Sequence, residues 1–495
     1  MRLTRAINLT HGLFLTCLLL AVSLIFNTHA THATSYTVST NDVSPAVIDS
    51  DCTLREAIEN INTQPAQTNL DCAAADGVDD TITIPSGSTT LQADLPTITT
   101  SMKIVGAGLN QTKVYGGGNV VFNTFGTNTD SLVVSDIMIT NFRAPAIQTQ
   151  GINLALRRVE VDGNGSSATG AITGISVQIP AGQLTFLSED VYVHDISTAD
   201  AQVGLIAGIA MLNKGTVNAT IRRTTIESIH SAAPSTAAAV GLFGLSGLFD
   251  GEGTPSTSNI DYGNITITDI SSATQAMGIG MVGIVTGGAS AVSGSVKNVT
   301  VTNISGTVTA SGLIVAAGSF APEDDYVVNL DFQNVLVAVD GSDDCTFRDA
   351  STEYGGTGTA SINATSFGGN ITGDNTCSTQ FTQPTDKNNI TNLKDFLGPL
   401  SNNGGYVPTM PLLAGSPAID NGVTVSDLTT DARGVTRPQG AAYDSGAYEY
   451  VPPATLASTG QNTQTYLALT AALTLPVLLL FSSHIFNNRK STNRA

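Results

Sequence analysis

The sequence predicts an all-β chain wound into a right-handed parallel β-helix, with a short N-terminal helix and a C-terminal transmembrane helix. A pattern of alternating apolar and polar residues recurs seven times between residues 130 and 342, about 33 residues apart on average. A repeat of roughly 20 to 50 residues is typical of solenoids. Residues 130–341 show no sustained helical periodicity, and strands without crossover helices stack economically as a parallel β-helix. Chirality favours the right-handed form.

The composition agrees with a repetitive β-rich body. The 495 residues include 49 Gly and no Trp, and only 12% are charged. Low charge with abundant Gly, Thr, Val and Ile suits such a fold. The formal net charge of −20 repels phosphate, so we expect no nucleic-acid partner.

Residues 1–33 are expected to form a signal peptide. Arg2 and Arg5 precede the apolar stretch Leu13–Phe26, and Ala30 and Ala33 offer cleavage sites. The alternative is an N-terminal anchor that the mature protein retains. Either way, the body of the chain is exported.

A short amphipathic helix is predicted before the repeats. Thr53 and Glu56 have the spacing of a capping box. One face of the helix is apolar and carries Leu54, Ala57, Ile58 and Ile61. Because a solenoid has exposed ends that need covering, we expect this helix to lie over the first coil.

In each repeat the second and fourth positions are expected to face inwards, and the third and fifth to face solvent. The clearest copies are Asn264–Asp269, Asn298–Asn303 and Asn334–Val339. Asn or Asp begins five of the seven copies, at the place where a bend needs a residue tolerant of tight turns. Stacked coils would align these side chains as a polar ladder.

Four cysteines remain once Cys17 leaves with the signal peptide: Cys52, Cys72, Cys345 and Cys377. In an exported chain an even number suggests disulfides, with three possible connectivities. We expect the nearest-neighbour pairs, Cys52–Cys72 and Cys345–Cys377. A zinc site is the alternative, but no C-x-x-C pair is present and we expect no metal there.

The C-terminal segment predicts a surface anchor. Residues 466–486 carry no charge and would reach about 31 Å as a helix, enough to span a membrane. The basic tail 487–495 would stay cytoplasmic. The preceding motif Leu456-Ala457-Ser458-Thr459-Gly460 resembles a Gram-positive-type cell-wall sorting signal of the LAxTG variant. The resemblance implies cleavage between Thr459 and Gly460 by a sortase and attachment to peptidoglycan. The alternative is an uncleaved single-pass anchor.

Two further segments resemble regions of bacterial surface proteins. Asp51–Ile58, with Asp80–Ile84, Leu95-Pro96 and Ile104–Gly108, resembles the CSLREA domain, although Thr53 stands where that motif has Ser. Ser416–Asp420, Thr430–Gly434, Arg437-Pro438 and Asp444–Glu449 resemble the choice-of-anchor Q region. The middle of the chain is similar in pattern to pectate-lyase-like β-helices. The resemblance implies a surface protein with a β-helix body and no single activity.

These observations divide the chain into seven parts. They are a signal peptide (1–33), a CSLREA-like cap with first coils (34–118), β-helix repeats (119–342), C-terminal coils with the choice-of-anchor Q-like region (343–450), a linker with the sorting motif (451–465), the transmembrane helix (466–486) and the cytoplasmic tail (487–495).

Charged and aromatic residues gather at the predicted outward positions of three successive coils. They are Glu160, Asp162, Tyr192, His194 and Glu227. Asp162 and Glu227 are two coils apart, or about 9.6 Å, near the upper end of the carboxyl spacing in inverting glycosidases. The cluster is therefore read in three ways: as a solvated face, a glycan-binding groove or a catalytic site.

We expect no cofactor. An acidic run at Glu323, Asp324 and Asp325, with Asp340, Asp343 and Asp344 further on, offers oxygen ligands for calcium but lacks the D-x-D-x-D-G order.

The expected function is that of a wall- or membrane-anchored surface protein, adhesive, glycan-binding or structural, whose later Thr-rich coils could serve adhesion. The competing class is a polysaccharide lyase or glycoside hydrolase. The expected partners are a sortase, peptidoglycan, the membrane and an extracellular glycan or protein.

Overall fold

The computed structural model describes residues 34–42, 49–63, 71–75, 80–166, 172–198, 205–232, 238–246, 256–285, 289–319, 325–339, 341–352 and 355–453. The predicted signal peptide, sorting motif, transmembrane segment and basic tail lie outside these ranges. None of the helices within them is both long and apolar enough to cross a membrane. The chain divides into two units, 1–450 and 451–495, and the first contains all the elements below.

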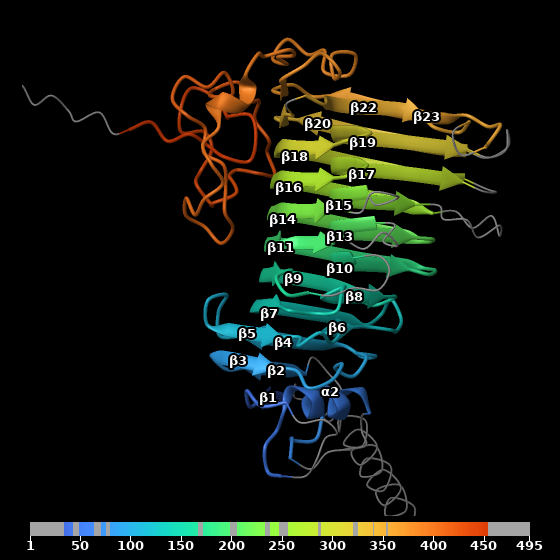
Figure 1. Ribbon diagram of the computed structural model, residues 1–495, viewed down its shortest axis with the longest axis vertical. Helices are drawn as coiled ribbons and strands as arrows, with labels where there is room; N and C mark the ends of the chain where they lie inside the picture. Colours follow the sequence, from blue (N-terminus) through green and yellow to red (C-terminus); the bar gives the residue numbers. More distant parts are fainter. Residues whose placement is uncertain are drawn as a thin grey trace, which may run out of the picture. The chain divides into compact units, whose positions relative to one another are not determined.

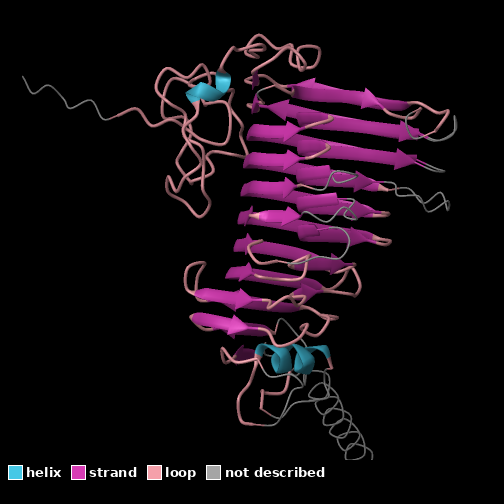
Figure 2. Ribbon diagram, viewed as in Figure 1, coloured by secondary structure: helices cyan, strands magenta, loops and turns pink. Residues whose placement is uncertain are grey.

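The first unit is built mainly of β-strands (Figures 1 and 2). The elements before the repeats are β1 (Ser35–Thr37), α2 (Leu54–Asn62), β2 (Thr81–Ile84), β3 (Gly87–Thr90), β4 (Met102–Gly106), β5 (Thr112–Tyr115) and β6 (Phe122–Asn123). The strands of the first repeats are β7 (Ser131–Thr140), β8 (Ile147–Gln150), β9 (Asn153–Asp162), β10 (Ile172–Ile179), β11 (Gln183–His194), β12 (Ile196–Thr198), β13 (Leu205–Asn213) and β14 (Thr216–Ser231). The later elements are β15 (Ala238–Ser246), β16 (Thr257–Ser272), β17 (Gln275–Val285), β18 (Ala289–Gly306), β19 (Thr309–Ser319), β20 (Asp325–Gln333), β21 (Leu336–Ala338), β22 (Asp343–Asp349), β23 (Ala360–Ser366), β24 (Ile371–Thr372) and the 3-10 helix η1 (Leu393–Phe396).

The strands form two sheets in which the pairings between the named strands are parallel. The larger sheet follows the order β1-β2-β4-β7-β9-β11-β14-β16-β18-β20-β23, and the smaller one β22-β19-β17-β15-β13-β10-β8-β6. From β7 onwards the chain passes back and forth between the sheets, so each round trip extends both; the short strands β12, β21 and β24 also belong to the larger sheet. This is the arrangement of a parallel β-solenoid, as the repeat predicts. One apolar core lies between the sheets and runs from Tyr36 to Phe381.

The bends occur where the repeat predicts them. The first residue of each copy has a positive φ, between 45° and 60°, and the regular pairing skips it; these residues are Asp136, Arg158, Asp190, Arg223, Asn264, Asn298 and Asn334. Asn and Asp tolerate this left-handed conformation because their side chains bond locally. Two of these seven residues are arginines, and each pairs with the aspartate at the same position of the preceding coil. Arg158 lies 2.5 Å from Asp136, and Arg223 lies 2.6 Å from Asp190.

The predicted N-terminal helix is present as α2. The capping box has formed, with the Thr53 N–H donating to Glu56 Oε2 at 2.9 Å and the Glu56 N–H donating to Thr53 Oγ1 at 3.3 Å. The four residues of its predicted apolar face are fully buried in the core. The Cys52–Cys72 disulfide joins the start of the helix to the segment that follows it. Figure 1 shows α2 beside β1 and β2, where the stack begins.

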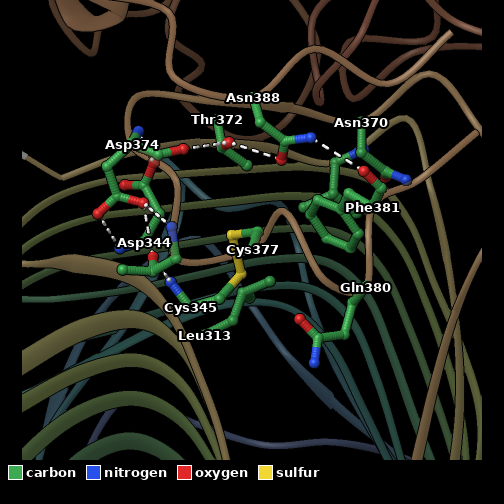
Figure 3. Close-up of a disulfide and its surroundings, with 12 residues drawn as sticks. Leu313, Asp344, Cys345, Asn370, Thr372, Asp374, Cys377, Gln380, Phe381 and Asn388 are labelled. Carbon is green, nitrogen blue, oxygen red and sulfur yellow. Dashed lines mark hydrogen bonds between the residues drawn. A yellow bond between two sulfur atoms is a disulfide. The ribbon is translucent and has the colours of Figure 1, made fainter. Parts of the chain in front are cut away.

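The coils continue past residue 342. β22, β23 and β24 pair in parallel with β19, β20 and β21, so the solenoid extends to Thr372. The second predicted disulfide, Cys345–Cys377, joins β22 to the segment after β24 (Figure 3). From residue 373 to 450 the chain has only isolated bridges and η1 among its described residues, and we name this region the C-terminal lobe.

The prediction that the third and fifth repeat positions face solvent is wrong for most of the later coils. Thr225, Thr266, Thr268, Thr300, Thr302, Leu336 and Ala338 are at most 3% exposed. The C-terminal lobe covers some of these residues. Thr225 Oγ1 donates to the Pro408 carbonyl at 2.7 Å, and the Ala447 N–H donates to Thr300 Oγ1 at 2.9 Å. Leu336 and Ala338 share a second apolar core with lobe residues that include Leu393 and Met410.

Candidate functional site

The five residues predicted for the site come from three adjacent strands of the larger sheet. Glu160 and Asp162 on β9 stand opposite Tyr192 and His194 on β11. Tyr192 in turn stands opposite Thr225 on β14, two residues before Glu227. The coil register assumed from the sequence is therefore the register of the sheet.

His194 lies at the centre of this group. Its Nε2 atom is 3.3 Å from Glu160 Oε1, and its Nδ1 atom is 2.8 Å from Asp195 Oδ2 and 4.0 Å from Asp162 Oδ1. The ring stacks on Tyr192 with the centroids 4.1 Å apart, and its side chain is only 11% exposed. Burial alone would lower the pKa of His194, yet hydrogen bonds with Glu160 and Asp195 carry the pKa above its usual value.

Tyr192 links His194 to the next coil. Its hydroxyl donates a hydrogen bond to Glu227 Oε1. Burial and this hydrogen bond raise the pKa of Tyr192 far above its usual value, so the phenol stays protonated at neutral pH. Tyr192 therefore acts as a hydrogen-bond donor, and Glu227 is held as an acceptor at the edge of the group.

The other carboxylates are fixed from outside the group. Asp162 accepts hydrogen bonds from Thr140 Oγ1 at 3.2 Å and from the Asn164 N–H at 2.9 Å. Asp195 accepts one from Asn164 Nδ2 at 3.1 Å. We name Glu160, Asp162, Tyr192, His194, Asp195 and Glu227 the acidic cluster.

Four arginines lie on β9 and β14, the strands that also carry cluster residues, but they do not neutralise the cluster. Each has an ion pair with a carboxylate outside the cluster: Arg157 with Glu189, Arg158 with Asp136, Arg222 with Asp261 and Arg223 with Asp190 and Glu189. His194 thus faces several carboxylates, and the cluster keeps an excess of negative charge.

Sequence reasoning missed one residue of the cluster, Asp195, and one lobe residue, Tyr406, that contacts β9. Asp195 directly follows β11, and its positive φ of 56° turns the carboxylate towards His194. Tyr406, from the C-terminal lobe, is 57% exposed, and its ring centroid lies 5.6 Å from the Arg158 guanidinium. Two residues further on, Pro408 contacts Thr225, so this lobe segment lies against the coils that carry the cluster. No pattern in the sequence links Tyr406 to Arg158, which lies in a distant part of the chain.

The possible calcium residues do not form a described site. Glu323, Asp324 and Asp340 lie outside the described residues, and so does the side chain of Asp325. Asp344 is fully buried and accepts N–H bonds from Val339, Gly373 and Asp374 (Figure 3). Its carboxylate therefore organises the chain around the second disulfide.

His230, which has no evident partner in the sequence, lies 3.3 Å from Asp269 and 2.7 Å from Ser271.

Comparisons of the chain with protein-family models, curated proteins and solved structures found no match.

Proposed function

We propose that this chain is an exported surface protein of a Gram-positive-type envelope, anchored by its C-terminal segment, and that its coil binds a glycan at the acidic cluster. The two disulfides support export, because such bonds persist in oxidising compartments. The signal peptide, the LAxTG motif and the apolar segment expected from the sequence supply the route and the anchor. We also infer that the coil is right-handed, on the chirality argument.

The two surface-protein resemblances fit this proposal through structural roles. The CSLREA-like segment contains α2 and its capping box. The choice-of-anchor Q-like residues build the interior of the lobe, where Arg437 pairs with Glu449 at 2.8 Å and neither side chain is exposed. Neither segment contributes a residue to the acidic cluster, so the binding function is assigned to the coils between them.

One observation carries the glycan proposal: the fold joins the five predicted residues into one partly buried group, with Tyr406 exposed on a segment that lies against the same coils. Carboxylates and a phenol can accept from and donate to sugar hydroxyls. An exposed tyrosine adds rigid, amphipathic contact area. Because the cluster and the whole chain carry excess negative charge, the proposed ligand is a neutral or amino-bearing glycan rather than a uronate polymer.

The Thr-rich later coils are not the proposed binding face. The sequence offered them as a surface for adhesion, but their threonines are buried, in part beneath the C-terminal lobe. A ligand would have to displace the lobe to reach Thr225 and Thr300.

Binding of the full chain to a glycan array tests the proposal. We expect neutral or amino-bearing glycans to bind and Tyr406→Ala to weaken binding about tenfold or more. Phe367→Ala is the matched control, since Phe367 is 56% exposed on another part of the coil. Equal loss in both variants, or no binding to any glycan, contradicts the proposal.

The competing enzyme function is tested in the same samples. A reducing-sugar assay and a lyase assay would be run on each glycan that binds. Hydrolysis or elimination that disappears in Glu160→Gln and Glu227→Gln would make the acidic cluster a catalytic site. Binding without product would leave it a binding site.

A further inference from the structure

We infer that His194, Asp162 and Asp195 form a binding site for a first-row transition dication of the Zn²⁺ type. The inference rests on the geometry of the acidic cluster, and it holds whether or not a glycan binds there. His194 Nδ1 and one oxygen from each aspartate all lie within 4.8 Å of one another. The ligand atoms of a tetrahedral zinc site lie about 3.4 Å apart, given metal–ligand bonds of about 2.0–2.2 Å. Small side-chain movements are enough to reach that spacing.

The backbone explains how neighbouring residues converge. In an extended strand, consecutive side chains point to opposite faces of the sheet. Asp195 has a φ of 56°, which breaks this alternation directly after β11, so the side chains of His194 and Asp195 meet. Asp162 is the register partner of His194 on the preceding coil. The three groups thus come from one bend and the strand end beside it.

The surroundings of the imidazole supply a second and independent indication. A histidine that binds a metal through one ring nitrogen usually donates its other N–H to a carboxylate, which fixes the tautomer. Glu160 Oε1 lies 3.3 Å from His194 Nε2 and is placed for this role. Metal binding would replace the Nδ1–H hydrogen bond to Asp195: with the remaining proton on Nε2, the Nδ1 lone pair becomes available to a metal that Asp162 and Asp195 also bind. Thr140 and Asn164 orient the two aspartates from outside.

Charge and ligand type select the class of metal. The cluster has more carboxylates than cationic groups, and the neighbouring arginines are paired elsewhere. A dication would compensate this charge. A site that includes an imidazole nitrogen suits zinc and its neighbours, whereas calcium prefers six to eight oxygen ligands. Three protein ligands leave a fourth position open for water or a ligand hydroxyl.

The test is calorimetric titration of the full chain with ZnCl₂ alone, in the absence of any glycan. We expect one zinc per chain, undisturbed by a large excess of CaCl₂. His194→Ala and Asp195→Asn should each weaken binding at least about tenfold, and Glu160→Gln about tenfold through the outer contact. The matched control is His230→Ala, because His230 lies 3.3 Å from Asp269 in a histidine–aspartate pair with no third metal-binding group in the described structure, and it should bind zinc normally.

Three results would overturn the inference. They are no zinc binding by the unmodified chain, zinc binding by the His194 and Asp195 variants that is as tight as in the unmodified chain, and displacement of zinc by calcium. If His194→Ala does not fold, Asp195→Asn decides alone. The Asp195 side chain is 43% exposed at a bend, so its substitution should leave the fold intact. Glycan binding is measured separately with zinc and with a chelator. Glycan binding without zinc binding removes only the metal site, and zinc binding without any glycan ligand removes only the proposed function.

Discussion

The coil and the C-terminal lobe belong to one unit but are stabilised in different ways. In the coil, each strand pairs with the strands above and below, and one continuous apolar core fills the interior. The lobe has few regular pairings among its described residues and two small apolar clusters. It depends instead on buried charged groups such as Arg437 and Glu449. Stability is therefore spread over many similar contacts in the coil and concentrated in a few contacts in the lobe.

The buried charges of the lobe replace missing backbone pairing. Irregular chain leaves N–H groups that must find acceptors. Asp431 accepts from the N–H groups of Arg433, Val435 and Glu449, while Asp444 accepts from those of Asp420 and Tyr450. Each carboxylate thus fixes several loops at once, and the loss of one such group should disturb more of the structure than the loss of a coil residue.

Arg437→Met should produce the largest effect. The Arg437 side chain is fully buried, and besides Glu449 it donates to the carbonyls of Asp444 and Gly446. Its removal leaves the Glu449 charge buried without its cation, which costs about 3–5 kcal/mol. Urea unfolding gives the change in free energy, and hydrogen exchange at Asp444 and Gln439 locates it in the lobe.

Arg157→Met is the matched control in the coil. Arg157 and Glu189 are 3.8 Å apart, and their side chains are 50% and 30% exposed. Exposed pairs contribute about 0–1 kcal/mol, so this variant should stay close to the unmodified chain. Comparable losses in the two variants would contradict the contrast between coil and lobe.

Mildly acidic pH should stabilise the lobe and its junction with the coil. Burial raises the pKa of Asp344, at the junction, and of Asp444, in the lobe, to about 7 each. In the unfolded chain both ionise near pH 4. Their contribution to folding is therefore complete below about pH 4 and is lost as the pH rises through about 7, by at least about 2 kcal/mol for the two together.

A double variant isolates this pH dependence. Asn does not titrate, so Asp344→Asn with Asp444→Asn should lack the decline between pH 4 and pH 7. The measured quantity is the free energy of unfolding of the unmodified chain minus that of the double variant, which should fall as the pH rises. Other carboxyls with lowered pKa, such as Asp136 and Asp427, act in the opposite direction but cancel in this difference. A flat difference would show that both groups ionise normally in the fold.

The same contrast explains which features the sequence could predict. The strands, the bends at residues such as Asn264 and the helix at Thr53 depend on local patterns that repeat or cap, and the structure confirms them. Both disulfides join cysteines that are close in the sequence. The lobe has no repeat, so nothing in the sequence indicated that Pro408 and Ala447 lie over Thr225 and Thr300.

The site, too, could be predicted only where its residues follow the repeat. Glu160, Tyr192 and His194 could be brought together because they occupy equivalent repeat positions on neighbouring coils. Tyr406 could not, because only the folded lobe brings it to Arg158. The role of Asp195 could not be predicted either, because it depends on the direction in which the bend after β11 turns its side chain.

A single bend residue of the coil should show a smaller effect than Arg437, and two substitutions separate its causes. Asn298 has a φ of 52°, is fully buried and accepts a hydrogen bond from Asn334 Nδ2 at 2.9 Å. Asn298→Ala loses this bond and places a Cβ-bearing residue without local hydrogen bonds in a left-handed conformation, so it should cost about 2–3 kcal/mol. Asn298→Gly loses the bond but accepts the conformation, and should cost about 1 kcal/mol less than Ala. Urea unfolding of both variants measures the difference. Equal losses would mean that the hydrogen-bond ladder, rather than backbone conformation, selects asparagine at the bends.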